Sequence, residues 1–97
     1  MREYAYELVM VVNPEVPQEN LATVVDKVQQ YITGKGGSVG DVAQWGKRRL
    51  AYRIKHFKEG HYVLANFKLQ PAHLKELEDS LRISEEVIRH LVVRKDE

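Results

Sequence analysis

Positively charged side chains are concentrated in one segment of the sequence, from Val42 to Lys58, which contains no acidic residue. This basic segment holds 6 of the 15 lysine and arginine residues of the chain: Lys47, Arg48, Arg49, Arg53, Lys55 and Lys58. Because the whole chain carries a net charge of only +1, the clustering favours docking of a polyanion such as RNA on one part of the protein. Charge alone leaves a second interpretation open, in which the cations keep an edge strand from pairing with other chains.

Side chains that could catalyse a reaction or hold a metal ion form no recognisable constellation. The chain has no cysteine, and its four histidines are scattered along it: His56, His61, His73 and His90. No two of them have metal-ligand spacing on one expected element, so each is interpreted as a surface histidine or one beside RNA. The sequence therefore predicts a protein that is not an enzyme and that has no metal site, no cofactor and no small-molecule substrate.

Hydrophobic periodicity predicts the element order βαββαβ in a single domain covering residues 1–97. The expected strands cover residues 4–12, 38–54, 60–70 and 87–94. Gly46 is expected to form a bulge within the long second strand, and residues 55–60 a polar turn after it. One helix begins near Pro17 and a second at Pro71, where proline suits the first turn. The first helix carries an apolar stripe formed by Leu21, Val24, Val25, Val28 and Ile32.

This order is typical of the ferredoxin-like α+β fold, a split βαβ sandwich with a four-stranded antiparallel sheet and two helices on one face. Right-handed crossovers place the first and third strands in the centre, so that the basic segment lies on an edge strand. The other face of the sheet stays open, and strand alternation puts on it Val9, Val11, Tyr62 and Leu64. Such an apolar patch favours a protein partner, although scattered exposed hydrophobic residues are also common.

Neither a signal peptide nor a membrane span is predicted. Acidic residues interrupt the N-terminal region that a signal peptide needs to be apolar. The longest wholly apolar run, Leu8 to Val12, is far too short to cross a bilayer. We therefore expect a cytoplasmic protein with no membrane contact.

Several strings of residues together resemble one family, the protein six (S6) family of the bacterial small (30S) ribosomal subunit. The most specific string is Trp45-Gly46-Lys47-Arg48-Arg49-Leu50-Ala51-Tyr52-Arg53-Ile54. It is accompanied by Asn13-Pro14 at the end of a tyrosine-rich strand, by Gly60-His61-Tyr62, and by the run from Val87 to Arg94. The chain departs from many members in having Arg53 where proline is common, and in a shorter charged tail, which puts partner contacts made by the tail in doubt.

The resemblance implies a structural protein of the small ribosomal subunit, which binds the central domain of 16S ribosomal RNA as a heterodimer with the small basic ribosomal protein eighteen (S18). The residues expected to contact RNA are Arg2, Lys47, Arg48, Arg49, Arg53, Lys55, His56 and Arg89. The expected partner surface comprises Val9, Val11, Trp45, Tyr62 and Leu64. Because adjacent side chains of a strand point to opposite faces, only one of Arg48 and Arg49 is expected to meet phosphate. For Leu50 and Tyr52, the alternative to a contact with RNA or the partner is a place in the core beneath the long strand.

Two other functions share the same element order and remain open as alternatives. A ligand-sensing regulatory domain of ferredoxin-like fold would form a homodimer through its sheet and bind amino acids or nucleotides. An acylphosphatase would need a glycine-rich loop with an arginine after the first strand, where this chain has Asn13-Pro14-Glu15-Val16. The sequence also leaves open a bacterial or a plastid source and a longer natural C-terminus.

Overall fold

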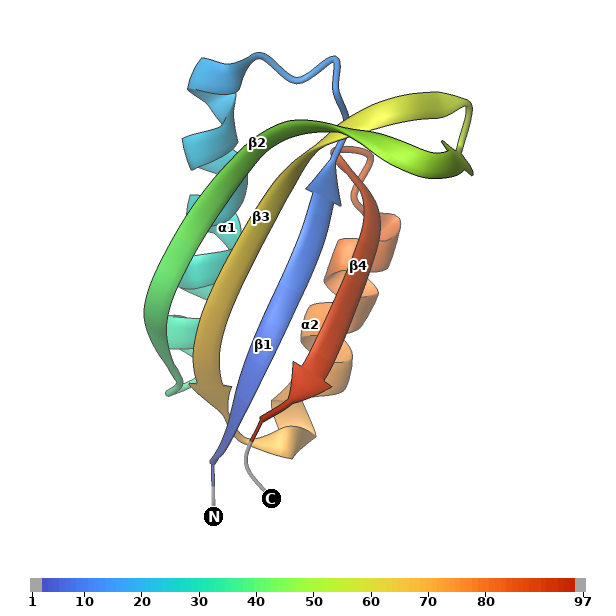
Figure 1. The fold of residues 1–97 in the computed structure, drawn as a ribbon. Helices are drawn as coiled ribbons and strands as arrows, with labels where there is room; N and C mark the ends of the chain where they lie inside the picture. Colours follow the sequence, from blue (N-terminus) through green and yellow to red (C-terminus); the bar gives the residue numbers. More distant parts are fainter. Residues whose placement is uncertain (1–2, 96–97) are drawn as a thin grey trace.

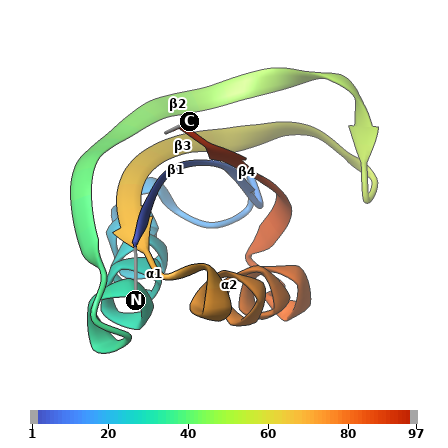
Figure 2. The same ribbon diagram turned by 90° about the horizontal axis from the view of Figure 1, so that it is seen from below.

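Four strands and two α-helices form one antiparallel sheet with a layer of helices against it (Figure 1). The structure is a computed structural model and describes residues 3–95. The elements are β1 (Tyr4–Val12), a short 3-10 helix η1 (Gln18–Asn20), α1 (Leu21–Gly34), β2 (Ser38–Ile54), β3 (Phe57–Leu69), α2 (Pro71–Ile83) and β4 (Val87–Arg94). The strand order is β2-β3-β1-β4, and Figure 2 shows both helices on the same face of the curved sheet. The predicted ferredoxin-like fold is confirmed.

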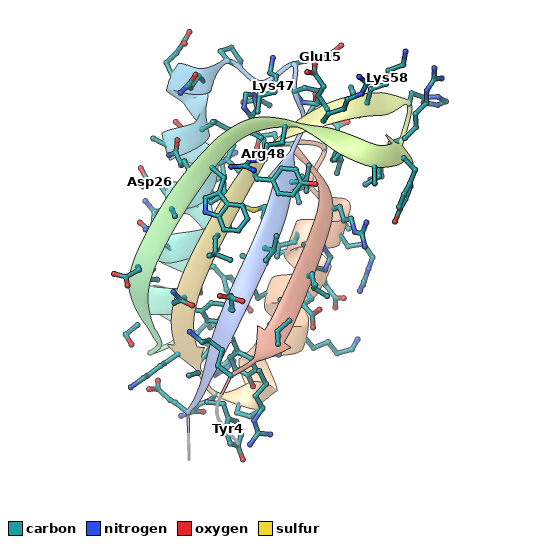
Figure 3. All side chains as sticks on the ribbon, in the orientation of Figure 1. Tyr4, Glu15, Asp26, Lys47, Arg48 and Lys58 are labelled. Carbon is teal, nitrogen blue, oxygen red and sulfur yellow. The ribbon has the colours of Figure 1, made fainter. Side chains whose placement is uncertain are left out.

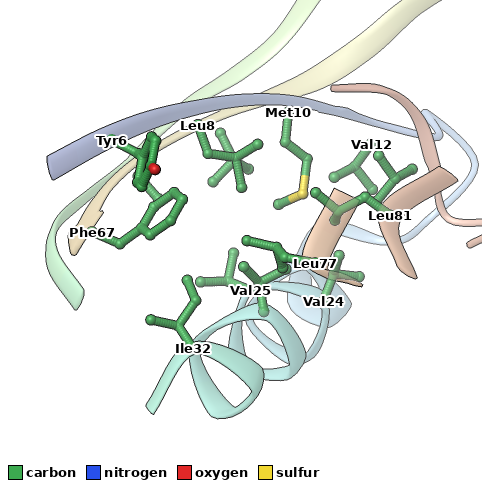
Figure 4. Close-up of a cluster of buried hydrophobic side chains, with 14 of the residues drawn as sticks. Tyr6, Leu8, Met10, Val12, Val24, Val25, Ile32, Phe67, Leu77 and Leu81 are labelled. Atoms are coloured by element: carbon green, nitrogen blue, oxygen red, sulfur yellow. The ribbon is translucent and has the colours of Figure 1, made fainter. Parts of the chain in front are cut away.

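The core lies between the sheet and the helices because side chains of β1 and β3 point alternately to the two faces of the sheet and α1 is amphipathic. Every second residue of β1 points toward the helices: Tyr6, Leu8, Met10 and Val12. These side chains meet the buried stripe of α1 and, from α2, Leu77 and Leu81 (Figure 4). The same alternation leaves the odd-numbered residues of β1 on the face that no helix covers, which we call the open face.

The turn between β2 and β3 is shorter than the sequence predicts. Only Lys55 and His56 form it, and β3 begins at Phe57, where a polar turn was expected to continue to Gly60. Both turn residues have positive φ, 50° and 74°, as a two-residue hairpin turn requires. Lysine and histidine are not the usual residues for this conformation, so the sequence carried no turn signal at that point.

The predicted bulge in β2 is confirmed. Gly46 has a φ of 88°, and the register between β2 and β3 shifts by one residue between Gln44 and Gly46. The extra residue is Trp45, which stands opposite no residue of β3. Glycine at this position adopts the left-handed conformation without the cost that a Cβ would bring.

His61 does not lie at the surface, and the interpretation of this histidine as a surface residue or one beside RNA is wrong. Its side chain is 5% exposed, and Nε2 lies 3.0 Å from the backbone carbonyl oxygen of Val16. The bond ties β3 to the loop that follows β1. His61 therefore has a structural role, which its position in an alternating strand did not reveal.

Candidate RNA and partner interface

The basic segment forms a hairpin that extends beyond the rest of the sheet. The pairing of β1 with β3 ends at the pair Val12 and His61, so residues 48–60 form no strand pairs with β1. We call residues 48–60 the hairpin extension. In Figure 1 it twists so that β2 crosses β3 and reaches over the end of β4, on the side of the molecule away from the termini.

The hairpin extension is held against the sheet by a small apolar cluster of its own. Leu50 is buried there against Val11 of β1 and Ile88 of β4. Ile54 and Phe57, from either side of the turn, pack on the same cluster. The interpretation of Leu50 as a core residue is therefore confirmed, and the basic segment is an anchored part of the fold instead of a loose arm.

A hydrogen bond adds a second attachment between β2 and β4. Arg89 donates from Nη1 to the hydroxyl oxygen of Tyr52 at 2.8 Å, and its guanidinium carbon lies 6.0 Å from the centre of the Tyr52 ring. Tyr52 is 64% exposed, so it is not a core residue. Tyr52 and Arg89 line one end of a groove on the open face, together with Val9, Val11, Leu50, Ile54, Tyr62 and Leu91.

The two sides of β2 in the hairpin extension differ in polarity. The inner side faces the groove and carries Leu50, Tyr52 and Ile54. The outer side carries Arg49 and Arg53, with Lys47 at the base of the extension, and all three are exposed. Arg49 and Arg53 line a shallow hollow with Lys58 of β3. The hairpin extension is thus amphipathic, with cations toward solvent and apolar groups toward the sheet.

The cations of the hairpin extension have no acidic partners among residues 3–95. By contrast, several cations on the helices are paired: Lys27 lies 3.2 Å from Glu86, and Arg82 lies 2.7 Å from Asp79. Lys55 and His56 stand at the turn, and both are exposed. In Figure 3 Lys47, Arg48 and Lys58 lie at the end of the sheet opposite Tyr4. Unpaired positive charges gathered at one end of a nearly neutral protein create a local field that attracts anions.

Arg48 and Arg49 lie on opposite sides of β2, as the alternation predicts. Arg48 stands opposite Gly60, on the same side as Tyr62, whereas Arg49 stands opposite Glu59. The Arg48 guanidinium lies 5.5 Å from the centre of the Trp45 indole, and its Nε donates to the Trp45 backbone oxygen at 3.4 Å. Arg48 is therefore joined to Trp45, and Arg49 is free to face an anion.

An apolar row crosses all four strands on the open face. The register aligns Ala43 of β2, Leu64 of β3, Val9 of β1 and Leu91 of β4. Leu91 is 53% exposed, and Val93 of the same strand is 44% exposed. Neither residue was among the partner contacts predicted from the sequence. The sequence feature that indicates them is the apolar character of residues 91 and 93, which point to the same face of a strand at the edge of the sheet.

The five residues expected on the partner surface do not have equal access to it. Val9, Tyr62 and Leu64 are half-buried on the open face, and Trp45 is 47% exposed beside it. Val11 is buried beneath Leu50 and supports the groove from below.

Seven of the eight residues expected to contact RNA lie on or beside the hairpin extension. Six belong to the basic segment, and Arg89 joins them through Tyr52. Arg2 lies outside the described residues.

Within residues 3–95 no group of three or more histidine, cysteine or acidic side chains could hold a metal ion. In the same part of the chain no helix is long and apolar enough to span a membrane.

Comparison with known proteins places this chain in a family. The sequence model of the family described as ribosomal protein S6 matches residues 5–94. The small ribosomal subunit protein bS6 of Heliobacterium modesticaldum is 50% identical over 97 residues, covering 100% of this chain and 99% of the relative. The bS6 protein of Moorella thermoacetica is 48% identical over 92 residues, with 95% of this chain and 94% of the relative covered.

The fold comparison agrees with the sequence comparison. The crystal structure of 30S ribosomal protein S6 from Thermotoga maritima superposes with a TM-score of 0.89 at 34% identity, covering 97% of this chain and 89% of that one. The likeness therefore extends through the basic hairpin and the open face as well as the core. On these grounds the chain belongs to the ribosomal protein S6 family.

Proposed function

We propose that the chain binds the central domain of 16S ribosomal RNA together with ribosomal protein S18, using two separate surfaces. The outer side of the hairpin extension faces the RNA, and the open face takes the protein partner. The observation that carries this proposal is the gathering of exposed cations, among them Arg49, Arg53 and Lys58, on the hairpin extension beside the apolar groove of the open face.

Family membership determines the broader function. The chain is a small ribosomal subunit protein, a structural component of a ribonucleoprotein that takes part in translation, and not an enzyme. As such it binds ribosomal RNA within the 30S subunit, on the ribosome of the cytoplasm.

The hairpin extension suits contact with the RNA backbone. Arg49, Arg53 and Lys58 surround one hollow, where a phosphate group can meet several cations at once. The other proposed RNA contacts are Arg2, Lys47, Arg48, Lys55, His56 and Arg89. Binding of this kind recognises the position of phosphates and the shape of the RNA, with little reading of bases. The open face has no row of stacking aromatic rings that would favour base readout.

A basic partner explains how a chain of net charge +1 binds RNA firmly. Lysine and arginine residues contributed by S18 would add to those of the hairpin extension. The proposed partner contacts are Val9, Trp45, Tyr62 and Leu64, with Leu91 and Val93 added from the geometry of β4, while the buried Val11 supports this surface from below. An exposed apolar surface of this kind is typical of a protein contact.

The test measures binding to a 16S central-domain RNA fragment, with and without S18, across a salt series. We expect tight binding only with S18 and a steep loss of affinity as salt rises. A variant combining Lys47→Gln, Arg49→Gln and Arg53→Gln should bind the RNA more weakly and show a shallower salt dependence. The matched control combines Lys27→Gln, Lys75→Gln and Arg82→Gln, which remove the same charge from the helices.

Three outcomes would contradict the proposal. Equal RNA affinity of the hairpin variant and wild type, with S18 present, would remove the hairpin from the RNA contact. An equal loss in the helix variant would show that only net charge matters. No RNA binding with or without S18 would leave the fold without this function.

A further inference from the structure

An acidic side chain stands at the margin of the apolar part of the open face, one row from Val9. Glu7 of β1 pairs with Asn66 of β3 on one side and with Val93 of β4 on the other. The next open-face residue along β1 is Val9, which lies in the apolar row. Glu7 is half-buried by these neighbours. A half-buried carboxylate therefore borders the apolar surface proposed for the partner.

Glu7 forms no ion pair with any cation among residues 3–95. Several acidic residues on the helix side are paired with cations, among them Asp79 with Arg82 and Glu86 with Lys27. The lysine that reaches across β1, Lys95, donates instead to the side-chain oxygen of Asn66 at 3.2 Å. Lys68, which stands opposite Ala5 one row away, forms no ion pair with Glu7 either.

Covering the open face with a partner changes the surroundings of this carboxylate. Contact with Val9, Leu91 and Val93 excludes water from the row next to Glu7. A carboxylate that loses its water without gaining a cation or hydrogen-bond donors is strongly destabilised. A partner that buries the apolar row must therefore supply a positive group at Glu7, or binding is weakened.

We propose that Glu7 is a specificity-determining residue of the open face, and that it receives a lysine or arginine of a protein segment whose flanking apolar side chains cover Val9, Leu91 and Val93. The inference rests on the proposed function, because it assigns to the partner of that function the chemistry of its contact. A carboxylate in this position also selects against acidic segments.

The same charge disfavours the other possible occupants of the face. An RNA strand would bring phosphate groups toward the Glu7 carboxylate, and like charges repel. A face-to-face dimer of this chain would cover the apolar row of each copy with a surface that carries the same acidic side chain beside it. Neither arrangement supplies the missing cation, whereas a basic protein segment does.

The experiment compares S18 binding by wild type and by Glu7→Gln, using the full chain and titration calorimetry at low and high salt. Glutamine keeps the size of the side chain but leaves the partner's cation buried without a counter-charge. We expect roughly 30-fold weaker binding or more, the loss typical of breaking a buried charge pair. Wild-type affinity should fall with salt more steeply than that of the variant.

Two further variants separate an ion pair from a structural effect. Glu85→Gln removes one exposed acidic residue from the connection between α2 and β4 and should leave S18 affinity unchanged. Glu7→Lys should abolish binding while the unfolding midpoint in urea stays near that of wild type. A large fall in that midpoint for Glu7→Gln would assign Glu7 a structural role and overturn the inference.

The outcomes also separate this inference from the proposed function. If wild type binds S18 and Glu7→Gln binds equally well, the function stands and the inference is wrong. If wild type does not bind S18, both are wrong. If sedimentation shows that wild type forms a dimer that Glu7→Gln strengthens and S18 does not disrupt, the occupant of the face is a second copy, which also overturns the inference.

Discussion

Arg89 and Tyr52 are 37 positions apart in the sequence, yet the Arg89 guanidinium donates to the Tyr52 hydroxyl at 2.8 Å. The bond joins β4, at the residue opposite Val11 of β1, to the part of β2 that follows the paired stretch of the sheet. With the cluster of Val11, Leu50 and Ile88, it fixes the direction in which the hairpin extension points. The positions of the outer cations therefore depend on contacts made on the inner side.

Replacing Tyr52 with phenylalanine should loosen the end of the hairpin extension without unfolding the domain. The change removes the acceptor of the Arg89 bond and should cost about 0.5–1 kcal/mol of unfolding free energy or less, because both groups are exposed. Amide hydrogen exchange of residues 50–56 should become faster. Tyr62→Phe is the control, and equal exchange rates in Tyr52→Phe and wild type would show that the bond does not hold the hairpin.

Replacing Trp45 with alanine should weaken partner binding while leaving the fold intact. The indole is exposed and stacks with Arg48, so its removal costs little in the free chain. Aromatic residues of this kind often dominate the energy of an interface, and we expect at least about tenfold weaker binding of S18. Ile83→Ala, an exposed apolar change at the end of α2, should have no effect. Unchanged affinity in Trp45→Ala would place the indole outside the interface.

Replacing Leu91 with glutamine tests whether β4 belongs to the partner surface. The loss of one apolar contact should weaken S18 binding roughly tenfold. The unfolding free energy should change by less than about 0.5 kcal/mol, since the side chain is already half exposed. Ile83→Gln provides the matched change outside the face. If both variants bind S18 as wild type does, the interface ends at β1.

Replacing Gly60 with alanine should destabilise the base of the hairpin extension. A Cβ at this position would overlap the Val11 side chain, which is itself buried beneath Leu50. We expect a loss of roughly 1–3 kcal/mol in unfolding free energy, measured by urea denaturation. Gly34→Ala, where a Cβ meets no atom within 4 Å, should instead be neutral or stabilising by about 0.5–1 kcal/mol. Equal midpoints for the two variants would contradict this account of the close contact at Gly60.

The core and topology followed from the sequence because periodicity reports burial directly. The stripe from Leu21 to Ile32 and the alternation of β1 each identify one buried face. The short turn at Lys55 and His56 could not be predicted, because neither residue is a usual carrier of positive φ and long-range packing of Ile54 and Phe57 imposes it.

The candidate site was less predictable than the fold because it depends on contacts between distant strands. Charge density identified the hairpin cations, but only the register shows that Arg48 is joined to Trp45 and Arg49 is not. His61 was misread because a buried histidine in a strand is recognised only by the carbonyl that it meets, here that of Val16. Leu91 is recognised as part of the open face only from the register of β4 with β1.

The regular pairing that follows the bulge at Gly46 makes the length of this short stretch more important than the identity of its residues. Lys47, Arg48 and Arg49 pair in turn with His61, Gly60 and Glu59, and the register becomes irregular only after Arg49. Deleting or inserting one residue between Gly46 and Arg49 would exchange the sides of β2 on which Arg48 and Arg49 lie. We therefore expect evolution to accept very few changes in the number of residues between Gly46 and Arg49.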